Sequence, residues 1–151
     1  MANIVPDSFK AELLAGSHNF EYGVSAQVFK LALYVTTLGP PYTTSSTVYS
    51  TSNEVSSVGT NYSAGGNALT LDTLSGSVPG SNTAIVDFVN LTFSSVTLTA
   101  LGAAIYNSST TPANMLCLVL DFGGNKTATS GDFTIQFPSP TAADAIIRLG
   151  D

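Results

Sequence analysis

The chain has 151 residues, of which 44% are hydrophobic and only 9% are charged. This is the size of one domain that buries its own core. The formal net charge is −6, and the four cations, Lys10, Lys30, Lys126 and Arg148, are scattered along the sequence. Nucleic-acid binding needs clustered Lys and Arg to displace counterions from phosphates. We therefore expect no nucleic-acid partner.

Hydroxyl groups, rather than charges, dominate the polar residues. About a quarter of the chain is Ser or Thr. A surface with few charges has little self-repulsion and is typical of subunits that are held in an assembly. The N-terminus shows no basic region followed by an apolar one, and no apolar run approaches the roughly 18 residues of a membrane helix. We expect neither secretory export nor a membrane partner.

The N-terminal segment contains the one helix signal of the sequence. A proline precedes Asp7 or Ser8 as the N-cap, and Gly16 provides the C-terminal stop. The predicted helix has about two turns and would be marginal alone, so its apolar face must dock on its own subunit or on a neighbour. That face consists of Phe9, Leu13 and Leu14.

From residue 27 the hydrophobic period changes to two, which is typical of strands. Phe29, Leu31, Leu33 and Val35 share the predicted core face of the first strand. Turn residues separate the later segments, including glycine-containing turns at 123–125 and 130–132. Further strands are predicted at 68–73, 83–88, 95–106, 116–122, 132–137 and 145–149.

This pattern predicts an all-β fold, an antiparallel β-sandwich or jelly roll with a short N-terminal amphipathic helix. We divide the chain into a helix and arm at residues 1–20 and a β-sandwich domain at residues 21–151. Residues 42–67 are rich in Ser and Thr and alternate only weakly. We interpret them as a long loop with a strand candidate at 47–49, and such loops tend to carry contacts.

Catalytic motifs are scarce. Cys117 is the only cysteine, which excludes an intrachain disulfide and a two-cysteine metal site. It lies within the apolar run at 115–120 and is interpreted as a small buried hydrophobe, with a reactive thiol as the alternative. His18 is the sole histidine, and we interpret it as a hydrogen-bonding residue at the helix C-terminus.

Five aspartates at strand ends and turns are the candidate acidic groups. If several converged, they would suit a hard cation such as Ca²⁺, but no loop motif accompanies them, which favours solvated turns. A glycan hydrolase would need two carboxylates paired in a cleft. We expect no enzyme, no catalytic residue, no cofactor and no metal. The five are Asp72, Asp87, Asp121, Asp132 and Asp144.

Aromatic and apolar residues supply the candidate contact surface. The chain has six tyrosines and no tryptophan. Tyrosines in or beside loops favour a protein interface over a sugar platform. We predict that Tyr49 and Tyr62 of the long loop contribute to an interface. The predicted interface residues of the N-terminal segment are Phe9, Leu13, Leu14 and Phe20.

Seven segments, in order along nearly the whole chain, resemble a family of small tailed-bacteriophage virion structural proteins. They are FKAELLAGSHNF at 9–20, YSTSNEV at 49–55, GTNYSAGG at 59–66, AIYNSS at 104–109, LDFGGNKT at 120–127, FTIQFP at 133–138 and AIIRL at 145–149. The resemblance implies a structural role in the particle and no catalytic residue. The role it implies is capsid decoration (cement) or a neck or tail position.

We therefore expect a virion protein, assembled in the host cytoplasm, that binds the major capsid protein or other virion proteins. Homo-oligomers on symmetry axes favour a trimer. In our hypothesis residues 2–20 form an arm onto a sister subunit or the shell, and deleting them leaves a folded β body that no longer binds particles. The alternative is a neck, tail or fibre-associated component whose loop at 42–67 contacts a host receptor.

Overall fold

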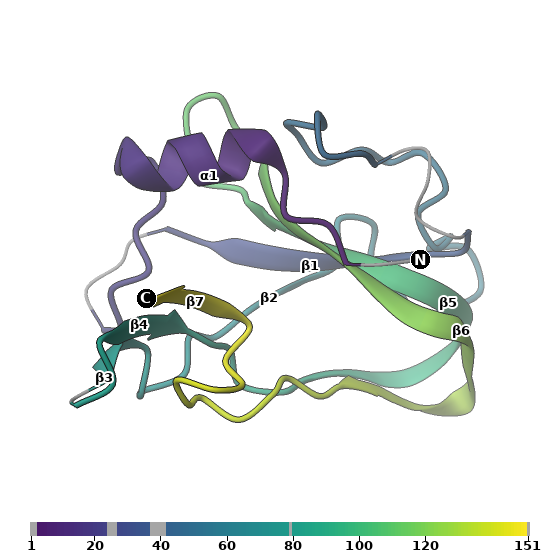
Figure 1. Ribbon diagram of the computed structural model, residues 1–151. Coiled ribbons are helices and arrows are strands. Elements are labelled where there is room, and N and C mark those ends of the chain that lie inside the picture. The colour runs from purple at the N-terminus through teal and green to yellow at the C-terminus, as the bar shows by residue number, and fades with distance from the viewer. Residues whose placement is uncertain (1–2, 24–26, 37–41, 79, 151) are drawn as a thin grey trace.

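The computed structural model describes residues 3–23, 27–36, 42–78 and 80–150. Over these residues it contains one helix and two antiparallel sheets (Figure 1). The elements are α1 (Asp7–Leu14), β1 (Phe29–Tyr34), β2 (Asn67–Ala68), β3 (Gly76–Val78), β4 (Thr83–Val86), β5 (Leu91–Asn107), β6 (Met115–Ile135) and β7 (Ile147–Gly150). The all-β class with a short N-terminal helix is confirmed. The sandwich or jelly-roll layout is not established by this strand order and stays a prediction.

The two sheets differ in their number of strands and in strand order. The larger has the order β2-β1-β5-β6, and the smaller has the order β3-β4-β7. The strand predicted at 68–73 is shorter, because only β2 pairs with β1 and Leu71 forms an isolated bridge to Phe88. Strand β3 was not predicted, since its glycine and serine show no alternation. Its extended state comes from pairing with β4, where Gly76 lies opposite Ile85.

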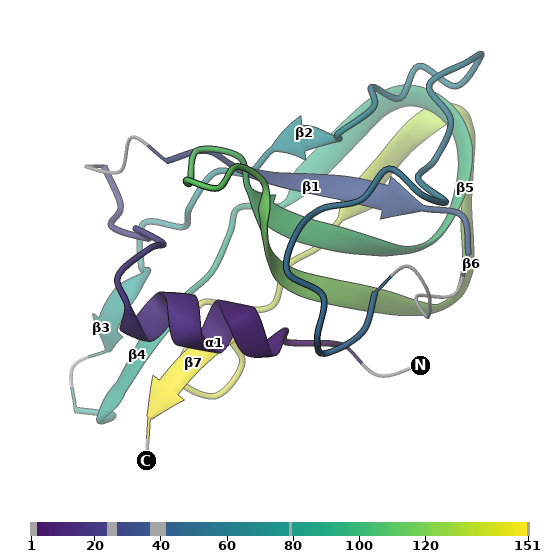
Figure 2. The ribbon, with the colours of Figure 1, turned by 90° about the horizontal axis from the view of Figure 1, so that it is seen from above.

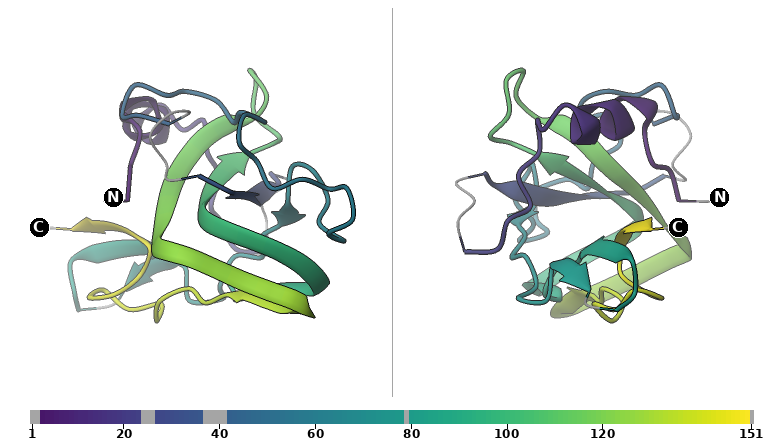
Figure 3. Two further views of the ribbon diagram at one scale, coloured as in Figure 1. Left: turned by 90° about the vertical axis from the view of Figure 1, so that its right-hand side faces the viewer. Right: turned by 60° about the vertical axis from the view of Figure 1, so that its left-hand side comes forward.

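Strand β6 runs through the turn expected at 123–125. Ala100 pairs with Lys126 and Gly102 with Asp121, so four residues of β6 stand opposite one of β5. The two glycines of this segment have φ angles of 70° and 153°, a region that favours glycine. They form a bulge rather than a turn, and both strands bend sharply together (Figure 3). A bulge accounts for such a bend.

A second irregularity replaces the turn expected at 130–132. The register shifts between Val96 and Leu98 of β5, and Ser130 of β6 has a φ of 48°. The Ser130 N–H donates to Oγ1 of Thr97 at 2.9 Å. Both turn predictions were therefore wrong for one reason: bulges and turns need the same residues, those that tolerate positive φ.

Strand β1 is buried on both faces. Phe29, Leu31 and Leu33 lie in the main core, as predicted, together with side chains from both halves of the bent β5–β6 hairpin. Val35 follows the strand and is exposed, so its predicted core position was wrong. The opposite face of β1 packs in a second cluster that includes Tyr34. A central strand covered on both sides explains why its sequence is nearly all apolar.

Helix α1 begins and ends with backbone interactions. Pro6 is the N-cap and no side chain caps the helix, so the predicted caps Asp7 and Ser8 were wrong. Proline holds the extended backbone that precedes the first turn. Gly16, with a φ of 72°, ends the helix as predicted. Its N–H and that of Ser17 donate to carbonyls of the last turn, at 3.1 and 2.9 Å.

The N-terminal segment packs as part of the β body. Ile4 pairs with Val119 of β6 through two backbone hydrogen bonds of 2.9 Å. Phe9 of α1 lies in the main core. Packing is therefore continuous across residue 20, where we had divided the chain. Seen from above, α1 crosses over the start of β7 (Figure 2), and Figure 1 draws the helix above that strand.

Candidate functional site

Most of the predicted interface residues pack within their own subunit. Phe9 and Tyr62 are only 1% and 2% exposed. Leu13 and Phe20 pack against the same core. Tyr49 is half-buried and its ring stacks on Tyr106, with centroids 4.4 Å apart. These five placements correct the picture of a free contact surface, and of the six predicted residues only Leu14, at 93% exposure, has a largely exposed side chain.

Helical geometry explains why Leu13 and Leu14 differ. Residues four apart lie one above the other on a helix, so Leu13 shares the inward face of Phe9. Leu14 is one position further and points away from that face. We had predicted that Phe9, Leu13 and Leu14 share one apolar face. The exposure of Leu14 shows that this prediction was wrong for Leu14. An exposed leucine of this kind is available for contact but is not itself a site.

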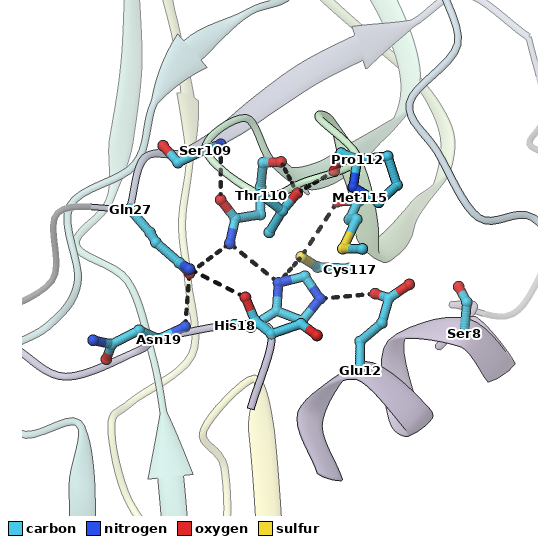
Figure 4. A network of polar contacts seen from close by, with 12 residues as sticks. Ser8, Glu12, His18, Asn19, Gln27, Ser109, Thr110, Pro112, Met115 and Cys117 are labelled. Atoms are coloured by element: carbon cyan, nitrogen blue, oxygen red, sulfur yellow. Dashed lines mark hydrogen bonds and ion pairs between the residues drawn. The ribbon is translucent and has the colours of Figure 1, made fainter. Parts of the chain in front are cut away.

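The sole histidine and the sole cysteine meet inside the core (Figure 4). His18 Nε2 lies 2.8 Å from Oε2 of Glu12, and His18 Nδ1 lies 3.9 Å from Sγ of Cys117. A thiol, an imidazole and a carboxylate in this order are the parts of a cysteine nucleophile site. Whether they act as one depends on the imidazole tautomer and on access.

Asn107 fixes that tautomer. Its Oδ1 accepts from the Ser109 N–H at 3.0 Å, and its Nδ2 donates to Oε1 of Gln27 at 2.7 Å. The second N–H of the amide points at His18 Nδ1, 3.1 Å away, which must therefore accept. The imidazole proton then lies on Nε2 and is donated to Glu12. His18 Nδ1 is thus engaged by the amide of Asn107.

Access to the thiol is also closed. Cys117 and Asn107 are fully buried. Burial raises the pKa of the Cys117 thiol far above its usual range, and the charge of Glu12 adds to the effect. Reactive cysteines have low pKa values and partial exposure. The interpretation of Cys117 as a buried hydrophobe is confirmed, whereas His18 lies in the core and joins α1 to the end of β5.

A second network centres on Glu54, which the sequence did not single out. Its Oε2 accepts from the Tyr49 hydroxyl at 2.5 Å, and its Oε1 accepts from the Tyr62 hydroxyl at 2.7 Å and from the Gly65 N–H at 2.6 Å. The Tyr62 hydroxyl accepts from the Leu33 N–H of β1 at 3.0 Å. One carboxylate thus ties the long loop to the sheet. An isolated acid in a loop rich in Ser and Thr was the only available signal.

The tyrosines of this region are committed to internal contacts. Tyr34 and Tyr42 join their hydroxyls at 2.7 Å, and Tyr34 also donates to the Ser50 carbonyl at 2.6 Å. Burial raises the pKa of Tyr106 to about 12. Burial, followed by hydrogen bonding to Glu54, raises the pKa values of Tyr49 and Tyr62. Internal hydrogen bonds therefore tie the loop at 42–67 to the body of the fold.

The aspartates do not form a metal centre. Among the described residues, no three His, Cys, Asp or Glu side chains lie close enough to hold a metal ion. Asp87 departs from the predicted solvated turn, because it is fully buried. Its Oδ1 accepts from the Phe88 N–H at 2.8 Å, and burial raises its pKa. Asp87 is a core residue of the β4 region.

A groove on the bent hairpin is neutral. It has a volume of about 510 Å³, and its described lining is hydroxyl, amide and aliphatic, with no charged or aromatic side chain. Thr99 and Thr127 lie in this lining and bond each other through their hydroxyls at 2.8 Å. This described lining offers hydroxyl groups but no carboxylate, imidazole or amine beside them that could act as a general base.

An apolar groove lies between α1 and β7, with a volume of about 280 Å³. We call it the α1–β7 groove. Strand β7 stands at the edge of its sheet, and Leu149 on it is 62% exposed. Two of the four cations of the chain, Lys10 and Arg148, belong to the lining. The described lining consists of Val5, Phe9, Lys10, Leu13, Leu118, Ile146, Ile147, Arg148 and Leu149.

Comparisons of the chain with protein-family models, with curated proteins and with solved structures find no significant match. Helix α1, the helix of the described ranges, has eight residues, and it is neither long nor apolar enough to cross a membrane. Function is therefore inferred from the sequence pattern, the fold and the α1–β7 groove.

Proposed function

We propose that this chain is a non-enzymatic structural protein of a bacteriophage particle, a capsid decoration (cement) protein that bridges and stabilises major capsid subunits. The resemblance of seven segments to tailed-phage virion proteins supports a place in a phage particle. The abundance of hydroxyl groups and the scarcity of charges support a role as a subunit of an assembly. The observation that carries the proposal is the open apolar α1–β7 groove beside an edge strand. An apolar groove beside an edge strand is a surface to which an extended chain of another protein can add.

The internal networks support a non-enzymatic role. The sole cysteine is sealed in the core, and the sole histidine is held between Glu12 and Asn107. Nucleophilic chemistry through this pair would need an accessible thiolate. These contacts join the helix to the hairpin, and the Glu54 network joins the long loop to the sheet, so together they stiffen the molecule. A rigid body loses little conformational entropy when it binds, which suits a clamp.

A cement protein acts by repetition. Each copy covers the junction between neighbouring capsid subunits, and the summed contacts oppose expansion of the shell. Sites on threefold or quasi-threefold axes repeat the same contact, which is why we propose a homotrimer. Individual interfaces of modest area are sufficient because many copies act together.

The test is a copy-number count in purified particles, by quantitative mass spectrometry against the major capsid protein. Hundreds of copies in simple ratio to the capsid subunit are expected for decoration. A few to a few dozen copies would overturn decoration and support the neck, tail or fibre alternative. Absence of the protein from washed particles would overturn both.

A stability measurement separates cementing from passive attachment. Particles that lack the protein should release their DNA at a lower temperature than particles that carry it, followed by the fluorescence of a DNA-binding dye. Adding the purified chain back should restore the higher temperature. Equal release temperatures at full occupancy would contradict a bridging role.

A further inference from the structure

We propose that the α1–β7 groove receives an extended, acidic and apolar segment of another particle protein, which adds to β7 as a further strand. This inference rests on the proposed function and names the surface and the kind of partner through which it acts.

The edge of the small sheet supplies the backbone part of this site. Four residue pairs join β7 to β4 on one side, and β7 is the last strand of the order β3-β4-β7. An edge strand presents N–H and C=O groups that pair readily with an incoming chain. Addition of a strand to such an edge is a common mode of peptide recognition. Residues of α1, Phe9, Lys10 and Leu13, line the groove opposite those of β7.

The groove supplies the side-chain part. Phe9 and Leu13 of α1 and Leu118 of β6 contribute apolar lining, and Ile147 and Leu149 of β7 complete it. Side chains of a strand alternate between its two faces. A strand paired to β7 would therefore direct every second side chain into the groove. Apolar residues at those positions would cover the exposed side chain of Leu149.

The cations at the groove select the charge of the segment. Lys10 and Arg148 belong to the lining, in a chain whose net charge is −6. Lys10 Nζ lies 2.8 Å from Oδ1 of Asp7, but both side chains are more than half exposed, so this pair is weak and readily exchanged. Arg148 donates from Nη1 to the Ala143 carbonyl and has further N–H groups to offer.

The same charge disfavours a second copy of this chain as the occupant. Antiparallel pairing of two β7 edges across a twofold axis would bring the two Arg148 side chains within cross-strand reach. Like charges placed in this way are destabilising. Carboxylates on a segment of a different protein would instead meet both cations. The occupant is therefore a different protein of the particle.

The test uses the full chain with the photo-cross-linking amino acid p-benzoylphenylalanine at position 149. The matched control carries it at position 74. Each variant is produced in host cells during infection, so that it can enter new particles. Leu149 and Leu74 are 62% and 63% exposed, and only Leu149 lies in the groove. Purified particles are irradiated and the products are sequenced by mass spectrometry. Position 149 should cross-link to an Asp- or Glu-containing segment of another particle protein, and position 74 should give about tenfold less of that product.

Each other outcome decides a different point. Cross-links from position 149 to a second copy alone would overturn the choice of occupant. Incorporation into particles without any product at position 149 would overturn the groove inference and leave the proposed function standing. Absence of the wild-type chain from particles would defeat the proposed function and this inference together.

A charge reversal tests the same site without a bulky label. Arg148→Glu should lower the number of copies per particle about tenfold, the loss expected for one charge contact of moderate strength. The control Lys126→Glu changes an exposed cation outside the groove and should leave the copy number unchanged. Circular dichroism confirms that both variants fold. Equal copy numbers for the two variants would overturn the role of the cations.

Discussion

The rings of Phe9 and His18 pack against each other inside the core, with their centroids 5.1 Å apart. Phe9 belongs to α1 and His18 follows it, and Phe20 meets Phe9 edge to face at 6.3 Å. The N-terminal segment therefore contributes its rings to the same core as the strands. Deleting residues 2–20 would remove Phe9, His18 and Phe20 from that core. The structure therefore speaks against our hypothesis that the deletion leaves a folded β body.

The helix makes a direct test of this packing possible. Phe9→Ala should lower the free energy of unfolding by about 3–5 kcal/mol, because it leaves a cavity in a closed core. Leu14→Ala, on the exposed face of the same helix, should change it by less than about 0.5 kcal/mol. Urea unfolding followed by circular dichroism measures both. Similar small losses for the two variants would contradict the docked helix.

Gly66 provides a second matched pair. A methyl group added there would overlap the carbonyl oxygen of Leu31, and the residue has a φ of 69°. Gly66→Ala should therefore cost about 3 kcal/mol or more of stability. Gly59 has a φ of 73° in open space, so Gly59→Ala should cost only about 1 kcal/mol. Equal melting temperatures would show that the two turns are not constrained as described.

The tyrosine network predicts a cooperative alkaline transition. Tyr34, Tyr42, Tyr49, Tyr62 and Tyr106 all have pKa values raised by burial above the ordinary value of 10.0. A raised pKa in the folded state gives stability that is present below pH 10 and is lost as the pH rises through the folded pKa. Most phenolate absorbance near 295 nm should therefore appear together with unfolding. Gradual ionisation of all six tyrosines in a folded chain would contradict this.

Asp87 predicts a pH dependence on the acid side. Burial raises its pKa from the ordinary 3.8, so the stability it confers is present below that value and is lost as the pH rises through the folded pKa. In the Asp87→Asn variant the side chain cannot ionise, so this contribution to the pH dependence is absent. The free energy of unfolding of the variant, minus that of the wild type, should rise with pH above about 4 and then level off. A difference that stays flat would place Asp87 in water.

Alternating sequence predicted the strands that bury one or both faces. Strand β1 was predicted from the alternating residues Phe29, Leu31 and Leu33. The same apolar periodicity predicted most of β5 and the two ends of β6. The middle of β6 was missed because the residues at 123–125 suit a bulge as well as a turn. Strand β3 depends on its neighbour for its structure and has no local signal.

The networks were harder to foresee than the strands. Glu54 acts through Tyr49 and Tyr62, which lie five and eight residues away in a loop without regular spacing. Leu14 looked like Leu13 because composition does not show where a helix face ends. Charge at the α1–β7 groove arises from Lys10 and Arg148, which lie at opposite ends of the sequence. Their proximity exists only after β7 pairs with β4.

The reactivity of the buried Cys117 thiol can be used to measure how often the core opens. The chain has a single cysteine, so any modification by iodoacetamide occurs at one known atom. In the folded state the reaction should slow in proportion to the fraction of time that the core is open. Alkylation rates across a urea series would give the free energy of that opening without any substitution in the chain. Labelling of the native chain as fast as of free cysteine would mean that the core around His18 opens freely.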